Sequence, residues 1–178
     1  MQIKSFLSKC ASCVLVAIGA MTVAAPPSQA QTGTGYYCGS SDGLPTTIYQ
    51  SPDDEIPLIR WKTTLGEVWT PQARCEEVAR RFDRFDREAT LEFLTTGEVN
   101  KMPVVCAVAR EGEECSDRYN SDRVLFTLPV GRDPNEALEQ LLGFATVVEN
   151  GDPRTYSNGR TYVNVKLLMR RNRRLYNR

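Results

Sequence analysis

The sequence predicts a single α+β domain, with two helices packed on a mostly antiparallel sheet and disulfide bonds that staple the fold. Two segments carry apolar residues at helical spacing, and each opens with a capping residue followed by proline. Short β-branched runs separated by turn residues predict strands. Four cysteines follow the first 30 residues. These observations place sheet and helices in one layered domain.

The N-terminal segment has the pattern of a secretory signal peptide. Lys4 and Lys9 precede an apolar run that ends near Ala25, and Ser28-Gln29-Ala30 places small residues before a cut at residue 31. An uncleaved anchor is the alternative, but a membrane span needs about 20 apolar residues, more than this run offers. We expect a signal peptide over 1–30, the domain over 31–168 and a basic tail over 169–178. Export to the periplasm, the thylakoid lumen or the medium follows.

The first half of the domain begins with strands. Residues 36–38, 45–49 and 56–61 have strand composition, and the glycine-rich stretch 39–43 predicts the first turn. Pro57 restricts the third strand to a sheet edge or to a strand start, because proline cannot donate a ladder hydrogen bond.

The clearest helix follows. Thr70 is the expected N-cap and Pro71 the first helical residue. The apolar stripe consists of Cys75, Val78, Ala79, Phe82 and Phe85, and the arginines between them, Arg74, Arg80, Arg81, Arg84 and Arg87, alternate with acidic residues. We therefore expect these arginines to form pairs within the helix rather than an anion-binding surface.

The second half contains further strands and one helix. Strands are expected over 91–95, 104–109 and 124–128, the first two joined through Gly97 and Asn100. Asp133 and Pro134 open the second helix in a capping-box arrangement, and its buried face is Ala137, Leu138, Leu141 and Leu142. Asn158-Gly159 predicts a tight turn before a last strand over 162–168.

The four cysteines of the domain predict structural disulfides. A bridge between Cys106 and Cys115 would close a polar loop, which leaves Cys38 to pair with Cys75. The loop-entropy model gives the two bridges about 2.7 and about 3.9 kcal/mol respectively. The cysteines have neither the C-x-x-C spacing of a redox-active dithiol nor the paired short spacings of a zinc site.

Catalytic motifs are sparse. The chain has no histidine, so Gly39-Ser40-Ser41-Asp42-Gly43, which matches the nucleophile-elbow string, lacks the base that such a serine needs. A carboxylate-only mechanism is the alternative function, a small extracytoplasmic hydrolase, and its candidate acids and bases are Asp53, Asp54, Glu55, Glu111, Glu113 and Glu114. No glycine-rich phosphate loop or calcium-loop spacing is present, and we expect no catalytic residue, metal or cofactor.

Charge is distributed unevenly along the domain. Residues 31–150 contain 12 basic and 21 acidic residues, whereas 151–178 contain 8 basic and 1 acidic residue. Contact with a membrane surface or an acidic protein partner is expected from Lys166, Arg170, Arg171, Arg173, Arg174 and Arg178, which are interleaved with apolar residues. The alternatives are a disordered solubilising end and a tail that folds back on the acidic body. The acidic body disfavours nucleic acid as a partner.

Ordered sequence strings resemble one known family. They are Tyr37-Cys38-Gly39, Gly43-Leu44-Pro45-Thr46-Thr47, Ile59-Arg60-Trp61, Thr70-Pro71-Gln72-Ala73-Arg74-Cys75, Val78-Ala79-Arg80-Arg81-Phe82, Leu94-Thr95-Thr96-Gly97, Pro103-Val104-Val105-Cys106 and Leu125-Phe126-Thr127-Leu128. In order and spacing, over 36–142, they are similar to the cyanobacterial circadian oscillating polypeptide family. The resemblance implies a cyanobacterial source, an exported protein, peripheral membrane association, daily varying abundance and no enzymatic activity. It carries over the four cysteines and no active site.

Three functional hypotheses follow. The favoured one is a non-enzymatic exported domain that binds a membrane surface or a protein partner. The second is the carboxylate-dependent hydrolase, which requires acids from separate elements to meet in one pocket. The third is an inhibitor-like module, which requires the loop between Cys106 and Cys115 to protrude.

Overall fold

The strands form two antiparallel sheets. The computed structural model describes residues 33–131, 133–143 and 152–176, all within one compact unit that spans Thr32–Arg178. One sheet has the order β1-β2-β3 and the other the order β6-β5-β4-β8-β7. The predicted α+β class is confirmed. The strands form two sheets and not the single sheet that we expect from the sequence. Local sequence patterns indicate where strands occur, but they do not indicate which strands pair.

The three-stranded sheet is built by consecutive strands, β1 (Gly35–Ser41), β2 (Leu44–Gln50) and β3 (Glu55–Arg60). The turn between the first two is shorter than the expected stretch 39–43. It consists of Asp42 and Gly43, which have φ angles of 52° and 73°. β3 is an edge strand, as its proline predicts.

The five-stranded sheet combines strands from distant parts of the chain: β4 (Phe93–Val99), β5 (Met102–Val108), β6 (Val124–Thr127), β7 (Arg154–Ser157) and β8 (Arg160–Asn164). A short 3-10 helix, η1 (Ser121–Arg123), precedes β6. The predicted turn at Asn158-Gly159 is confirmed, with φ angles of 51° and 72°. The turn between β4 and β5 uses Asn100 and Lys101, at φ angles of 52° and 60°. Gly97, expected in this turn, lies inside β4.

Two helices begin where their caps predict. In α1 (Pro71–Arg87), the Thr70 side chain accepts a hydrogen bond from the backbone N–H of Ala73. In α2 (Pro134–Leu141), the Asp133 carboxylate accepts from the backbone N–H groups of Asn135 and Glu136. The first helix buries the whole predicted apolar stripe and, in addition, Arg74.

A third helix stands where the sequence predicts the end of a strand and a tail. β8 ends at Asn164, and α3 (Val165–Tyr176) follows directly. The Asn164 side chain accepts from the backbone N–H of Leu167, as an N-cap does. The expected boundary between residues 168 and 169 therefore falls inside a helix, and 169–176 belong to the folded domain. The predicted signal peptide and Arg178 lie outside the described residues.

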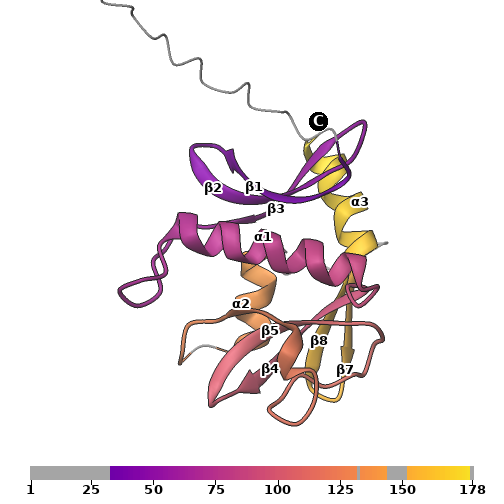
Figure 1. Cartoon of the computed structure of the whole chain (residues 1–178). Helices are drawn as coiled ribbons and strands as arrows, with labels where there is room; N and C mark the ends of the chain where they lie inside the picture. The colour runs from indigo at the N-terminus through magenta and orange to yellow at the C-terminus, as the bar shows by residue number, and fades with distance from the viewer. Residues whose placement is uncertain (1–32, 132, 144–151, 177–178) are drawn as a thin grey trace, which may run out of the picture. The chain divides into compact units, whose positions relative to one another are not determined.

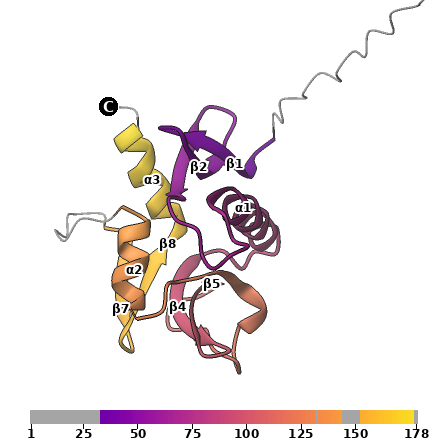
Figure 2. The same ribbon diagram turned by 90° about the vertical axis from the view of Figure 1, so that its left-hand side faces the viewer.

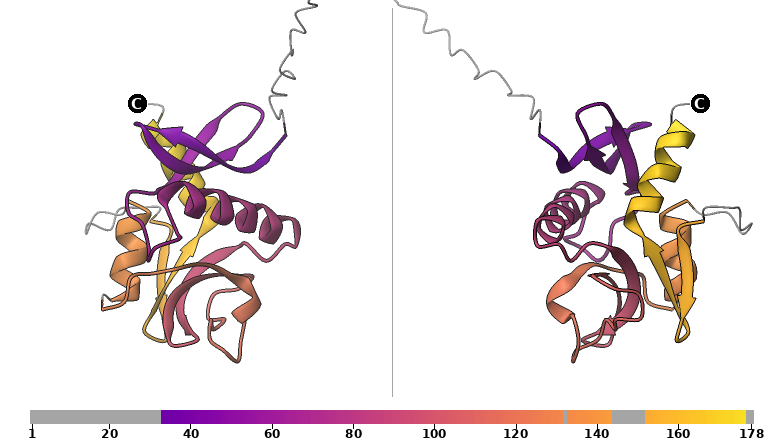
Figure 3. Two further views of the ribbon diagram at one scale, coloured as in Figure 1. Left: turned by 60° about the vertical axis from the view of Figure 1, so that its left-hand side comes forward. Right: turned by 90° about the vertical axis from the view of Figure 1, so that its right-hand side faces the viewer.

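The helices lie between and beside the sheets. Figure 1 shows α1 crossing between the three-stranded sheet and the five-stranded sheet, and Figure 3 shows the same arrangement from two other sides. α3 contacts β3 and β8, while α2 contacts β4 and β5. In Figure 2 both helices lie on the same side of the domain. One core unites the layers, with fully buried side chains such as Trp61, Phe82, Leu94, Leu138 and Leu168.

Candidate functional site

Helix α3 carries the basic residues that the sequence assigns to partner contact. Val165 and Leu168 are buried against the core and anchor the helix. The Lys166 ammonium lies 2.9 Å from a carboxylate oxygen of Glu92, and the Arg173 guanidinium lies 3.0 Å from Asp54. The acidic partners that are missing from the neighbouring sequence are thus supplied by distant elements.

Polar contacts also fix the last turns of α3. Arg171 donates to the backbone carbonyl of Gly143 at 2.8 Å, and the Asn172 amide donates to that of Pro57 at 2.8 Å. The helix is therefore folded onto the acidic body, as one of the sequence alternatives expects. Arg170 and Arg174 are exposed one turn apart, and no carboxylate of the described residues pairs with either.

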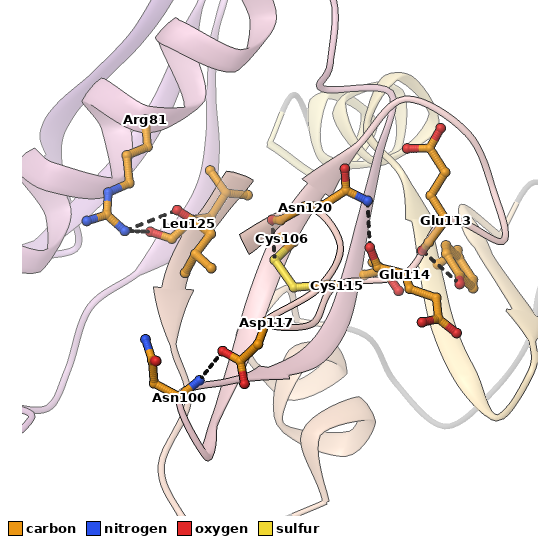
Figure 4. The surroundings of a disulfide bond; sticks show 12 residues. Arg81, Asn100, Cys106, Glu113, Glu114, Cys115, Asp117, Asn120 and Leu125 are labelled. Carbon is orange, nitrogen blue, oxygen red and sulfur yellow. Dashed lines mark hydrogen bonds between the residues drawn. A yellow bond between two sulfur atoms is a disulfide. The ribbon is translucent and has the colours of Figure 1, made fainter. Parts of the chain in front are cut away.

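The structure contains both disulfides that the sequence predicts. Cys38–Cys75 joins β1 to α1, with 5.4 Å between the Cα atoms. Cys106–Cys115 joins β5 to the loop that follows it, with 6.1 Å between the Cα atoms (Figure 4). The first bridge ties the three-stranded sheet to the central helix, and the second closes a loop on the five-stranded sheet.

The segment around Cys115 lies against the five-stranded sheet. Ser116 forms a backbone bridge with Glu98 of β4, and the Asp117 carboxylate accepts from the backbone N–H of Asn100 at 2.7 Å. The Tyr162 hydroxyl of β8 donates to the backbone carbonyl of Glu113 at 3.2 Å. Residues 113–117 are therefore held at the sheet, whereas Arg110 and Glu111, at the turn of the loop, are exposed, and the inhibitor-like module stays a prediction.

The two carboxylate clusters lie on separate elements. Asp53, Asp54 and Glu55 precede and begin β3, whereas Glu111, Glu113 and Glu114 follow β5. Basic side chains engage several of them: Glu113 pairs with Arg110 and Arg123, and Glu114 with Arg160. Neither cluster lines the cavities described below, and the described residues contain no group of three or more potential metal ligands.

The helical pairing expected for α1 holds for most of its arginines. Arg80 and Arg81 both pair with Glu77, and Arg87 pairs with Asp83. The two guanidinium groups lower the pKa of Glu77 and outweigh the effect of its partial burial. Arg84 instead lies over the Phe85 ring.

The expectation that Arg74 pairs with an acidic residue of the helix is wrong. Arg74 is only 8% exposed, and its guanidinium lies 4.5 Å from the centre of the Trp61 ring. It donates to the carbonyl oxygens of Thr63 and Thr127 at 3.3 and 3.4 Å. A signal was present in the sequence, because Arg74 stands four residues before Val78 and is therefore in phase with the apolar stripe.

Arg74 lines a cavity of about 700 Å³. The walls come from the end of β3 and the residues after it, the segment after β6, the second half of α2 and the last turns of α3. The basic lining residues are Arg60, Lys62, Arg74 and Arg171, and none of the described lining residues is acidic. A smaller cavity of about 110 Å³ lies on another side of Arg74, next to Trp69 and Leu125.

Comparison with known proteins identifies a family and no closer relative. No curated protein and no solved structure gives a significant match. Within the described residues, no helix has the length and apolar character that a membrane crossing requires. The model of the family described as circadian oscillating protein COP23 matches residues 35–170. This match covers most of the chain, which therefore belongs to the circadian oscillating protein COP23 family.

Proposed function

We propose that the mature protein is an exported, non-enzymatic domain that docks reversibly on an anionic membrane surface through the outer side of α3. The observation that carries this proposal is the pair of exposed arginines, Arg170 and Arg174, without a carboxylate partner among the described residues. The other described basic residues of α3 contact the domain itself.

The expected strength of docking follows from these two charges. A basic residue near an anionic bilayer contributes about 1 kcal/mol, so two contribute about 2 kcal/mol, or roughly 30-fold in affinity. Leu167, 36% exposed, stands three residues before Arg170 and therefore lies on the same face of the helix. Its side chain enters the interface beside the charges and strengthens a contact that is otherwise electrostatic.

Export and the absence of catalysis have separate support. Two disulfides are typical of an oxidising compartment outside the cytoplasm, such as the periplasm, the thylakoid lumen or the medium. Acids that the hydrolase alternative needs, including Asp54, Glu113 and Glu114, are held in ion pairs on different elements. No observation favours that alternative, so we propose a binding role without a catalytic site or cofactor.

Vesicle co-sedimentation of the oxidised protein, residues 31–178, tests the proposal. We expect binding to vesicles that contain phosphatidylglycerol, no binding to neutral phosphatidylcholine vesicles, and release at about 1 M salt, where the Debye length is about 3 Å. The Arg170→Gln/Arg174→Gln variant should bind about 30-fold more weakly.

The matched control removes the same charge from another surface. Lys101 and Arg118 are exposed, on the β4–β5 turn and on the loop before β6. Lys101→Gln/Arg118→Gln should retain the vesicle affinity of the natural sequence. Equal losses in the two variants would attribute binding to net charge alone and contradict docking through α3. Absence of vesicle binding at low salt would overturn the membrane surface as the partner and leave an acidic protein as the alternative.

A further inference from the structure

The 700 Å³ cavity has the size of a site for a small organic molecule. Ligand pockets in proteins typically enclose about 300–1,000 Å³. Its walls come from five separate parts of the chain, including α2 and α3, which Figure 2 shows on one side of the domain. The outward-facing arginines of α3, Arg170 and Arg174, are not among the lining residues. The cavity is therefore distinct from the surface proposed to dock on membranes.

The charge of the cavity is opposite to that of the surrounding domain. Four of its described lining residues are basic and none is acidic, although residues 31–150 contain 21 acidic and only 12 basic residues. Arg60 is partly neutralised, because its guanidinium lies 2.9 Å from Asp42. Lys62 is exposed, and the described residues supply no carboxylate partner for it. The cavity thus offers a positive potential that attracts anions.

Arg74 is the strongest indication of an anionic ligand. Buried charges in proteins are normally paired, because an isolated ion loses its hydration without compensation. Among the described residues Arg74 has two carbonyl oxygens and the face of Trp61 as neighbours, and no carboxylate forms an ion pair with it. Burial lowers its pKa, and no nearby acid opposes this effect. An anion in the cavity would supply the missing counter-charge.

Apolar side chains form much of the remaining wall, beside the polar residues Thr63, Gln140 and Asn172. Trp61, Leu58, Leu128 and Leu142 are buried at its inner side, with exposures of 1–5%. At the outer end, Leu175 and Tyr176 are 56% and 61% exposed although they line the cavity. Exposed apolar side chains beside a buried cation suit a ligand with an apolar body as well as a charge.

We propose that this cavity binds a single-chain amphiphile with one anionic headgroup, a carboxylate or a phosphate. The headgroup lies between Arg74 and Lys62, and the chain extends along Trp61 towards Leu175 and Tyr176. No bond is made or broken in this binding. The site is independent of membrane docking, so either proposal can fail without the other.

Tryptophan fluorescence tests the proposal directly. The chain has two tryptophans, and in the Trp69→Phe variant only Trp61, in the cavity wall, remains. Dodecanoate with a brominated chain, kept below its micelle concentration, should quench Trp61 saturably with one molecule per protein. Its uncharged methyl ester should bind at least about tenfold more weakly, since a charged hydrogen bond is lost. Dodecyl phosphate should compete with the brominated acid, which tests the second headgroup.

Three outcomes would overturn the proposal. No quenching below the micelle concentration would show that the cavity does not accept such a chain. Equal quenching by the acid and its ester would show that the basic residues do not recognise a charge. Displacement by acetate or inorganic phosphate at concentrations similar to those of dodecanoate would show a site for small anions without a role for the apolar walls.

Substitutions at exposed positions complete the test without disturbing the core. Lys62→Gln should weaken dodecanoate binding about fivefold, because one basic group near the headgroup is lost. Leu175→Asp should also weaken binding, because it places a negative charge at the outer end of the cavity, where the apolar chain lies. Lys101→Gln, outside the cavity, is the matched control and should leave affinity unchanged. Arg74→Met should reduce affinity at least about tenfold if its melting curve shows that it folds. Unchanged affinity in both Lys62→Gln and Leu175→Asp would contradict the proposed orientation.

Discussion

Gly97 is the residue whose substitution gives the sharpest test of the fold. It lies inside β4, where the loop closed by Cys106–Cys115 passes over the strand. A Cβ atom at this position would lie 1.9 Å from the carbonyl oxygen of Cys115 and 2.7 Å from its carbonyl carbon. Both are backbone atoms, so no side-chain rotation can relieve the overlap.

The cost of Gly97→Ala follows from this geometry. Ordinary contact begins at 3.4 Å, so the loop and the strand must separate by about 1.5 Å. Overpacking a well-packed region typically costs 1–3 kcal/mol, and a backbone contact anchored by a disulfide belongs at the upper end, about 3 kcal/mol. For a domain of this size the melting temperature should fall by about 9 °C.

Thermal unfolding of the oxidised protein, followed by circular dichroism, measures this effect. Gly33→Ala is the matched control, because an added Cβ there meets nothing within 4 Å and its φ angle is not positive. The control should shift the melting temperature by no more than about 2 °C. In a Cys106→Ser/Cys115→Ser background the loop can move, so Gly97→Ala should cost clearly less there. A melting temperature of Gly97→Ala within about 2 °C of the natural sequence would refute the reasoning.

Three further predictions concern stability. Cys38→Ser/Cys75→Ser should lower the free energy of unfolding by about 3.9 kcal/mol, measured by urea denaturation; a loss below about 1 kcal/mol would contradict the loop-entropy account. Arg154 holds the pKa of Asp152 below its ordinary value, so their pairing stabilises the fold above about pH 4 and is lost as the pH falls through the lowered pKa. Asp152→Asn should therefore cost about 2 kcal/mol at pH 7 and progressively less in acid, whereas a pH-independent cost would exclude this linkage. The buried hydroxyl of Tyr36 has no hydrogen-bond partner among the described residues, so Tyr36→Phe should leave the melting temperature unchanged or raise it, and a clear drop would reveal a missed partner.

Local signals in the sequence predict local structure well. Thr70 and Asp133 cap helices because a side-chain oxygen can reach backbone N–H groups two or three residues away. Asn158-Gly159 makes a turn because both residues tolerate positive φ angles. Gly97 shows the limit of such signals. A side chain is excluded at this position because the backbone of Cys115 lies against it. The neighbouring sequence does not contain this contact, and from that sequence alone a glycine here is explained equally well by a turn.

The candidate cavity depends on contacts that no local pattern contains. Lys62, Arg74 and Leu175 come together only because α1, β3 and α3 pack around one space. Arg74 is informative in the sequence through its phase with the apolar stripe, but that phase indicates burial and not what lies opposite. From the sequence, Arg74 is therefore expected to pair with an acidic residue on the helix surface. Only the structure shows that the Trp61 ring and two carbonyl groups from distant segments surround its guanidinium.

The basic C-terminal segment shows why net charge is a poor measure of a binding surface. Residues 151–178 contain 8 basic residues and 1 acidic residue, yet Lys166 and Arg173 are paired with Glu92 and Asp54. Deleting 169–178 would remove Asn172 and Arg173 from the body as well as the exposed arginines, so lost membrane association could reflect lost folding. Only substitutions confined to Arg170 and Arg174 separate the two effects, because these side chains are exposed and the packed face of α3 stays intact.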